Sequence, residues 1–272
     1  MSERAYLQRP NWPLATYAVA FMAFLYVPVL LLPLFSFNDG LYIAFPIEGF
    51  TTRWYEQMFA NTAMHAALLN SLQVGFVTAV VATGLGIFAA KAITRYRMPG
   101  QKPVIAVIML PLVIPEIILG TSLLILVNNI GLGLSLVSVT LGHILISVPF
   151  ATAVLMSRFE GFDRSLEEAS ADLGENAWWT FWRVTFPMVF PGALSSFLLC
   201  FIISFDEFLI AFFLTGTDPT LPIFIYSQLR FPQRLPSTLA LGACIIMVSF
   251  AVIAFNEWFR RRSSHGLSDT GL

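Results

Sequence analysis

Six long apolar runs dominate the sequence, and each approaches the length of about 20 residues that a helix needs to cross a bilayer. The runs cover residues 14–37, 67–90, 103–127, 134–156, 188–214 and 238–259. Only 11% of the residues are charged, whereas soluble domains carry about 25%. The sequence therefore predicts an all-α integral membrane protein with six transmembrane helices, folded as a single domain over residues 1–272.

Basic residues are spread unevenly between the two sides of this predicted membrane domain. If the N-terminus is inside, all but three of the 15 Lys and Arg residues fall in inside segments, the exceptions being Arg53, Arg230 and Arg234. By the positive-inside rule, this places both termini and the loop of about 158–187 in the cytoplasm. The first apolar run is too long for the core of a signal peptide, so we expect it to be retained.

The loop between the fourth and fifth runs is polar and has the pattern of two short helices joined by a glycine. Ser165 and Glu168 have the spacing of a capping box, which predicts a helix that starts near Leu166. Gly174 fits the position just after the end of that helix. We expect the chain to turn there.

A second short helix is predicted directly after this turn. Asn176 can cap its first turn, and Pro187 is expected to limit it and to introduce the next membrane segment. The apolar stripe of this helix consists of Trp178, Phe181, Trp182 and Val184. Two helices joined at a glycine, with an exposed apolar stripe, are suited to docking on a partner protein.

This loop resembles the EAA cytoplasmic loop of binding-protein-dependent ABC importer permeases. The matching residues are Glu168, Ala169, Gly174, Val184, Phe186 and Pro187. Ser170 replaces the second Ala of the usual pattern, which exchanges one small residue for another. The resemblance implies the type I ABC importer permease architecture, in which this loop is a coupling helix seated in a groove of a separate ATPase subunit. The alternative is an ordinary loop between membrane helices.

Four further phrases resemble spermidine/putrescine importers, in particular their second, C-type permease subunit. They are PLFSFN at 33–38, GFTTRWYEQMF at 49–59, SRFEGFDRSLEEASADLG at 157–174 and SFDEFLIAFFLTG at 204–216. The resemblance implies ATP-driven import of putrescine or spermidine across the bacterial inner membrane. Related permeases for iron, sulfate, molybdate or opines share the architecture, so another small solute is the alternative.

The resemblance also implies the partners of the chain. They are a second, similar permease subunit, two copies of an ATP-binding subunit that hold ATP and Mg, an external substrate-binding protein in the periplasm or outside the cell, and membrane lipid. This chain has no G-x-x-x-x-G-K-[ST] phosphate loop and no H-E-x-x-H or G-x-S-x-G motif. We therefore expect a transport subunit that is not an enzyme, with no catalytic residue, metal or cofactor of its own and no nucleic-acid partner.

Three carboxylates fall inside predicted membrane helices, where charged side chains are costly and rare without a function. A cationic substrate would keep them ionised, and the rings of Phe205 and Phe208 can supply cation–π contacts. Adjacent residues on a helix point about 100° apart, so Asp206 and Glu207 cannot face one narrow lumen equally. We hypothesise that Glu116 and Asp206 line a substrate pathway, with Glu207 as a further candidate. Alternatively, these acids form hydrogen bonds inside the helix bundle.

Two other classes of transport protein remain as alternatives. In a proton-coupled secondary transporter Glu116 and Asp206 would relay protons, but the sequence has no internal inverted repeat of the kind such transporters use. A passive channel would explain the acids but not the loop of 168–187. Whether transport needs ATP and a second protein distinguishes these classes.

The segment after the first run includes an amphipathic pattern formed by Trp54, Tyr55, Met58 and Phe59. A helix here would either anchor the outside loop at the membrane or contact an external partner. In the fourth run, we interpret His143 as a packing residue rather than a ligand. Cys200 and Cys244 lie in predicted membrane helices and indicate neither a disulfide nor a metal site.

Overall fold

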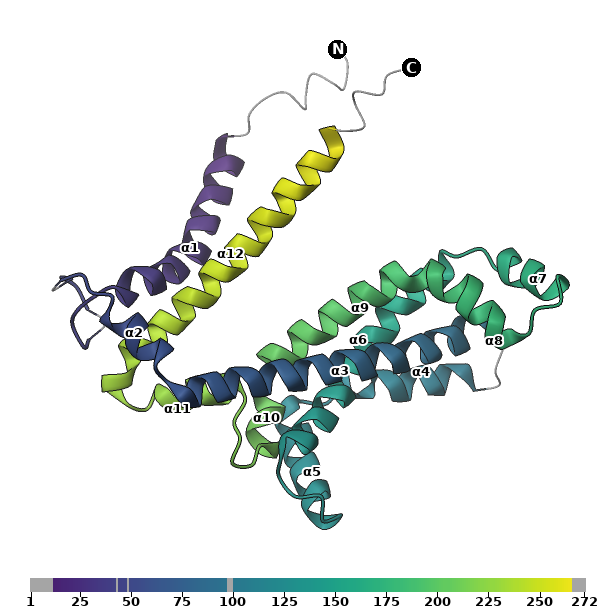
Figure 1. The fold of residues 1–272 in the computed structure, drawn as a ribbon, viewed down its shortest axis with the longest axis horizontal. Coiled ribbons are helices and arrows are strands. Elements are labelled where there is room, and N and C mark those ends of the chain that lie inside the picture. Colours follow the sequence, from purple (N-terminus) through teal and green to yellow (C-terminus); the bar gives the residue numbers. More distant parts are fainter. Residues whose placement is uncertain (1–11, 43, 48, 97–99, 266–272) are drawn as a thin grey trace. The chain divides into compact units, whose positions relative to one another are not determined.

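The computed structural model describes the backbone of residues 12–42, 44–47, 49–96 and 100–265, with side chains up to residue 251 (Figure 1). Over this part of the chain the secondary structure is helical, apart from one isolated bridge between Asn38 and Phe50. The chain divides into two compact units, residues 1–62 with 227–272, and residues 63–226. Some of the basic residues used to predict orientation lie outside the described side chains: Arg4, Arg9, Arg97, Arg260, Arg261 and Arg262.

The prediction of an all-α membrane protein is confirmed. The helices long and apolar enough to span a bilayer are α1 (Trp12–Ser36), α3 (Thr62–Arg95), α6 (Leu136–Glu160), the run Ala177–Asp206 and the run Pro232–Ala251, which includes most of α12 (Leu235–His265). A sixth span is present if the bent pair Gln101–Leu112 and Glu116–Asn129 counts as one crossing. The number of spans in the described residues is therefore five, or six with this broken helix.

The third apolar run forms a broken helix, so the prediction of one continuous helix over 103–127 is wrong. The helices α4 (Gln101–Met109) and η2 (Leu110–Leu112) end before α5 (Glu116–Asn129), and the two parts are bent by 97°. Pro115 has no N–H to donate and disfavours helical geometry in the residue before it. Glu116 consequently begins a helix instead of lying partway along one.

The fifth run is also interrupted. The helix α9 (Phe186–Asp206) ends at Asp206, Glu207 has extended backbone angles (φ −68°, ψ 117°), and α10 (Leu209–Leu214) follows. The carboxylate of Glu207 accepts a hydrogen bond from the N–H of Ile210 at 3.0 Å and so satisfies one of the free backbone donors in the first turn of α10. The prediction of one helix over 188–214 is therefore wrong at this point. The step of about 100° between the directions of Asp206 and Glu207 is also wrong, because it assumed that both residues lie in one helix.

In the unit of residues 63–226, α3, α6 and α9 lie side by side and share a hydrophobic core (Figure 1). Small residues allow this close packing, since a Cβ atom added at Gly86 of α3 would lie 2.7 Å from the Cβ of Ala151 in α6. At one end of these helices the chain forms α7 (Ser165–Asp172) and α8 (Ala177–Thr180). Towards the other end α5 and α10 pack around a core that contains Leu119, Val139, Ile210 and Leu214, and α11 (Leu221–Gln228) follows.

In the unit formed by residues 1–62 and 227–272, α2 (Arg53–Phe59) packs against α12, as does α1, and η4 (Pro232–Arg234) precedes α12. The amphipathic helix predicted here is confirmed. Trp54 and Met58 are buried, and the indole N–H of Trp54 donates to the carbonyl of Asn38 at 2.7 Å. Phe59 is exposed. Contact of this helix with the membrane or an external partner stays a prediction.

His143 is fully buried between α6 and α9, where its Nδ1 lies 2.8 Å from the hydroxyl oxygen of Ser204. This position agrees with the interpretation of His143 as a packing residue. Cys200 and Cys244 are both free thiols. The described residues contain no cluster of three or more His, Cys, Asp or Glu side chains suited to a metal ion.

Candidate functional site

The first helix of the polar loop, α7, begins where the sequence predicts, but it is capped differently. The carboxylate of Asp163 accepts a hydrogen bond from the N–H of Ser165 at 3.0 Å, and hydrogen bonds from Ser165 lower the pKa of Asp163. The side chain of Glu168 forms an ion pair with Arg164, with Nε–Oε1 at 3.0 Å. The predicted capping box of Ser165 and Glu168 is therefore wrong: Arg164 is the N-cap residue and forms no side-chain capping bond, while Asp163 satisfies the N–H of Ser165.

Gly174 ends α7 as predicted. Its φ is +89°, in the left-handed region that favours glycine. The N–H of Gly174 donates to Ala171 at 2.9 Å, and that of Glu175 donates to Ser170 at 3.2 Å. These two bonds form a Schellman motif, which satisfies carbonyls left free at the helix end. No atom lies within 4 Å of a Cβ added at Gly174, so the backbone angle alone restricts this position.

The second helix, α8, is capped by Asn176, whose side-chain oxygen accepts from the N–H of Trp179 at 3.0 Å. Pro187 does not end this helix, which corrects the prediction. A π-helical segment, η3 (Phe181–Thr185), joins α8 directly to α9, and the N–H of Phe186 donates to the carbonyl of Phe181. This wider turn accommodates Pro187, which has no N–H and would otherwise disrupt a regular helix.

Large apolar side chains are exposed on this loop. The tryptophan patch consists of Leu173, Trp178, Trp179 and Trp182. Leu173 is 86% exposed and Trp178 is 64% exposed. Of the predicted stripe, Phe181 is instead buried, and Trp179 takes a place on the surface. The rings of Trp178 and Trp182 lie 5.8 Å apart between centres, and exposed apolar surface of this kind is typical of an interaction site.

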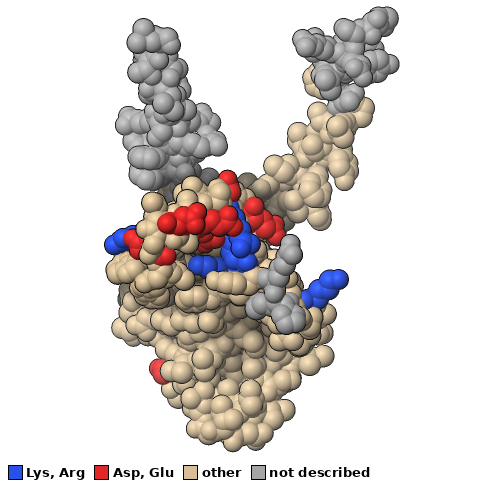
Figure 2. Space-filling model, turned by 90° about the vertical axis from the view of Figure 1, so that its right-hand side faces the viewer, with Lys and Arg blue, Asp and Glu red and all other residues tan. Residues whose placement is uncertain are grey.

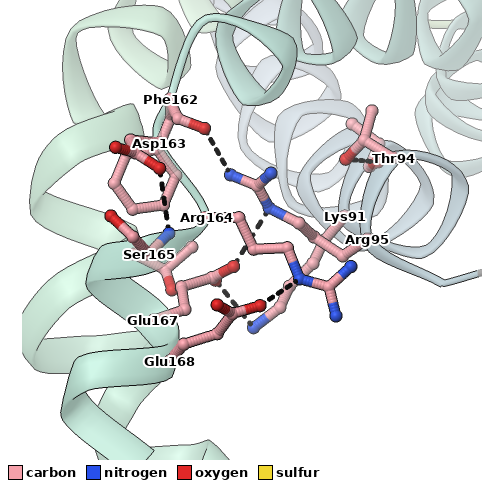
Figure 3. A network of polar contacts seen from close by, with 11 residues as sticks. Lys91, Thr94, Arg95, Phe162, Asp163, Arg164, Ser165, Glu167 and Glu168 are labelled. Carbon is pink, nitrogen blue, oxygen red and sulfur yellow. Dashed lines mark hydrogen bonds and ion pairs between the residues drawn. The ribbon is translucent and has the colours of Figure 1, made fainter.

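A network of charges holds α7 against α3 (Figure 3). Glu167 has a side chain that is only 15% exposed, and its Oε2 lies 3.0 Å from Nε of Arg95. The Nζ of Lys91 lies 3.9 Å from Oε1 of the same carboxylate, and the hydroxyl of Thr185 donates to this oxygen at 2.5 Å. Arg95 also donates to the carbonyl of Phe162 at 3.0 Å. Glu167 thus connects α7 to α3 and η3.

Sequence reasoning missed Glu167 and selected its neighbour Glu168, which is 63% exposed. Lys91 and Arg95 are spaced four residues apart near the end of α3, which places them on one helix face. This spacing was the available signal that a buried carboxylate partner should exist. The two cations instead served only to predict the cytoplasmic side.

Further polar contacts join α7 to the elements that follow it. The hydroxyls of Ser170 and Thr180 lie 3.0 Å apart and are buried, so the serine that replaces an alanine of the family pattern has a partner. Glu175 forms an ion pair with Arg183, whose guanidinium lies 4.7 Å from the ring centre of Trp179. A cavity of about 250 Å³ lies among these charged residues and the end of α3. Acidic side chains gather at this end beside Lys and Arg (Figure 2).

The predicted pathway residues lie at the two helix breaks described above. Glu116 and Asp206 are exposed, whereas Glu207 is half-buried. Phe205 and Phe208 are both half-buried. No described residue forms an ion pair with any of these three acids.

An aromatic cluster follows the second break. The ring of Phe208 lies 5.6 Å from that of Phe212 and 5.0 Å from that of Tyr226, measured between ring centres. Phe212 and Tyr226 are both partly exposed. Glu207 is the residue directly before Phe208, so a carboxylate lies next in the chain to this aromatic cluster.

Comparison with known proteins identifies the class to which this arrangement belongs. Residues 82–265 match the family described as binding-protein-dependent transport system inner membrane component, and the chain belongs to this family. It is therefore a permease of an ABC transporter and a multi-pass protein of the inner membrane.

Two relatives are similar over nearly the whole chain. Spermidine/putrescine transport system permease protein PotC of Haemophilus influenzae is 31% identical, over 89% of this chain and 94% of that protein. Putrescine transport system permease protein PotI of Escherichia coli K12 is 32% identical, over 92% of this chain and 91% of that protein.

Two solved structures share the fold. One is a bacterial ABC transporter involved in the import of the acidic polysaccharide alginate, with a TM-score of 0.66 and 17% identity, covering 96% of this chain and 98% of that chain. The other is a bacterial alginate ABC transporter in complex with an alginate pentasaccharide-bound periplasmic protein, with a TM-score of 0.71 and 19% identity, covering 99% and 98%. At these identities the likeness concerns the fold alone.

Proposed function

We propose that this permease carries polyamines, putrescine or spermidine, into the cell. The observation that carries the proposal is the identity of about a third with PotC and PotI, both named as permeases of such substrates, over about nine-tenths of the chain. The local chemistry agrees with it, because the half-buried Glu207 directly precedes Phe208, whose ring contacts those of Phe212 and Tyr226. Carboxylates attract ammonium groups, and ring faces accept them through cation–π contacts.

The transport cycle that we infer requires partner subunits. A second permease completes the pathway, an external binding protein delivers the substrate, and two ATPase subunits hold ATP and Mg on the cytoplasmic side. In the same proposal both termini and the α7–α8 loop are cytoplasmic, following the distribution of basic residues. The chain itself hydrolyses no ATP.

The α7–α8 loop is the proposed contact with an ATPase subunit. The tryptophan patch supplies apolar contact area, and exposed Glu168 is free to meet a cation once it leaves Arg164. Motion of the ATPase would reach the membrane helices by two routes. One is the continuous helical run from Ala177 to Asp206, and the other is the set of ion pairs from Glu167 to α3.

Replacing Glu167 with Gln should weaken the attachment of α7 to α3. The variant keeps an oxygen for Thr185 but leaves Arg95 and Lys91 without their carboxylate, at a cost of about 1–3 kcal/mol. Glu168→Gln removes an exposed ion pair and should cost less than about 1 kcal/mol. Thermal unfolding of the two purified variants measures the difference. Equal destabilisation would contradict the role assigned to Glu167.

Substrate identity is tested by competition. Cells that carry the full transport system should take up labelled spermidine, and unlabelled putrescine should reduce this uptake, whereas sulfate and molybdate should not. If a ferric complex, an opine or an oxyanion is the substrate that competes, the ABC permease assignment stands and the polyamine proposal is rejected.

A further inference from the structure

A groove separate from the α7–α8 cavity runs between α6 and α9 near the end of the helices that carries the loop. Its volume is about 710 Å³, within the range of about 300–1,000 Å³ typical of small-molecule sites. Val154 and Met188 provide apolar walls, while Ser157, Ser195 and Arg158 add polar groups. This combination of an apolar trough and a cationic end suits an amphipathic ligand.

Arg158 is the charged group of this groove. It lies in the last turn of α6, is exposed, and forms no ion pair or side-chain hydrogen bond with any described residue. Its aliphatic stem crosses onto α9, where a Cβ atom added at Gly192 would lie 2.3 Å from the Cγ of Arg158. Gly192 therefore makes room for the arginine, and the stem packs on the neighbouring helix while the guanidinium remains available.

The site also lies where a polar headgroup would be found. The groove occupies the last turns of α6 and the first turns of α9, two helices that span the bilayer, next to the polar loop between them. A guanidinium binds a phosphate through paired hydrogen bonds, and basic groups at the membrane surface attract anionic lipids. Ser195 donates its hydroxyl hydrogen to the carbonyl of Pro191 at 2.9 Å, so the free hydroxyl donor of the groove is Ser157.

We propose that this groove binds an anionic phospholipid of the phosphatidylglycerol class. Its phosphate lies against the guanidinium of Arg158 and the hydroxyl of Ser157, and the start of an acyl chain lies along Val154 and Met188. A carboxylate or a helix of another transporter subunit is the competing occupant. The lipid is favoured because one unpaired cation is joined to a groove whose lining is about equally polar and apolar, as a headgroup with the start of its acyl chain requires, within a membrane-spanning pair of helices.

Lipid binding to the full-length chain tests this proposal. The protein is purified in a mild detergent and titrated with dioleoylphosphatidylglycerol or dioleoylphosphatidylcholine, and bound lipid is counted by native mass spectrometry. The wild type should prefer the anionic lipid, and Arg158→Gln should weaken its binding about five-fold. Lys102→Gln is the matched control, because it removes one exposed cation outside the groove, and it should leave binding within about two-fold.

A second variant addresses the apolar part of the groove without changing charge. Val154→Trp fills the trough beside Arg158 and should lower phosphatidylglycerol binding while the protein remains monodisperse. Equal binding of the two lipids by the wild type, or equal effects of Arg158→Gln and Lys102→Gln, would overturn the proposal. So would a cross-link from the Val154→Cys variant to another transporter subunit in native membranes, since the groove would then be a protein interface.

Discussion

Gly174→Val should uncouple ATP hydrolysis from substrate uptake. We expect uptake to fall about ten-fold or more, because a loss of about 1.4 kcal/mol in coupling free energy corresponds to a factor of ten. Gly174 has a φ of +89°, which a β-branched residue adopts only with strain of about 1–3 kcal/mol. Relief of this strain would rotate α8 away from α7 and displace the tryptophan patch. The membrane helices pack without Gly174, so insertion should be normal.

Gly174→Asn is the matched control, since Asn tolerates the left-handed region better than other non-glycine residues. No atom lies within 4 Å of an added Cβ at this position, so the two variants differ mainly in backbone strain. Uptake and ATPase activity of the assembled transporter are measured at equal expression. Uptake by Gly174→Val at the wild-type rate would remove the loop from its assigned role.

Glu207→Gln should lower polyamine uptake about ten-fold or more, because hydrogen bonds to charged groups contribute about 1.5–3 kcal/mol. The substitution is selective: the amide oxygen of Gln can still accept from the N–H of Ile210 in the first turn of α10, so only the charge is lost. Glu116→Gln, which likewise replaces a carboxylate at a helix break with a neutral amide, should also lower uptake. Initial uptake rates at several spermidine concentrations are the measurement.

Asp206→Asn is the comparison variant, because Asp206 is the acidic residue directly before Glu207. From the sequence, Glu116 and Asp206 were assigned to the pathway, with Glu207 as a further candidate. In the structure Asp206 is exposed, whereas Glu207 is half-buried directly before the aromatic cluster. We expect Asp206→Asn to reduce uptake less than Glu207→Gln. If all three variants transport spermidine like the wild type, the carboxylates have a structural role and the polyamine proposal depends on its relatives alone.

The sequence predicted the parts of the molecule that depend on composition and on local backbone chemistry. Apolar length identified the spanning helices, and glycine's access to positive φ located the end of α7 at Gly174. Asn176 caps α8 as predicted, because its short amide reaches the backbone two to three residues ahead. Each of these features is decided within a few residues of chain.

Features that depend on helix breaks were not predicted. The apolar runs extend across Pro115 and Glu207, so hydropathy gives no sign that helices end at these two residues. Phe181 is buried although the sequence placed it on an exposed stripe, and the π-helical segment Phe181–Thr185 that shifts the helical periodicity after it has no signature in the apolar pattern. Glu167 and Glu168 are adjacent glutamates, and only the position of α3 decides which one is buried.

The most direct test of the account is spermidine uptake by cells that contain this permease with its complete transport system, compared with cells that lack only the ATPase subunit. Membrane levels of the permease are matched, and the proton gradient is kept intact in both. We predict accumulation of labelled spermidine in the complete system and none without the ATPase. Equal accumulation without the ATPase, abolished when the proton gradient is collapsed, would contradict the account and indicate a secondary transporter.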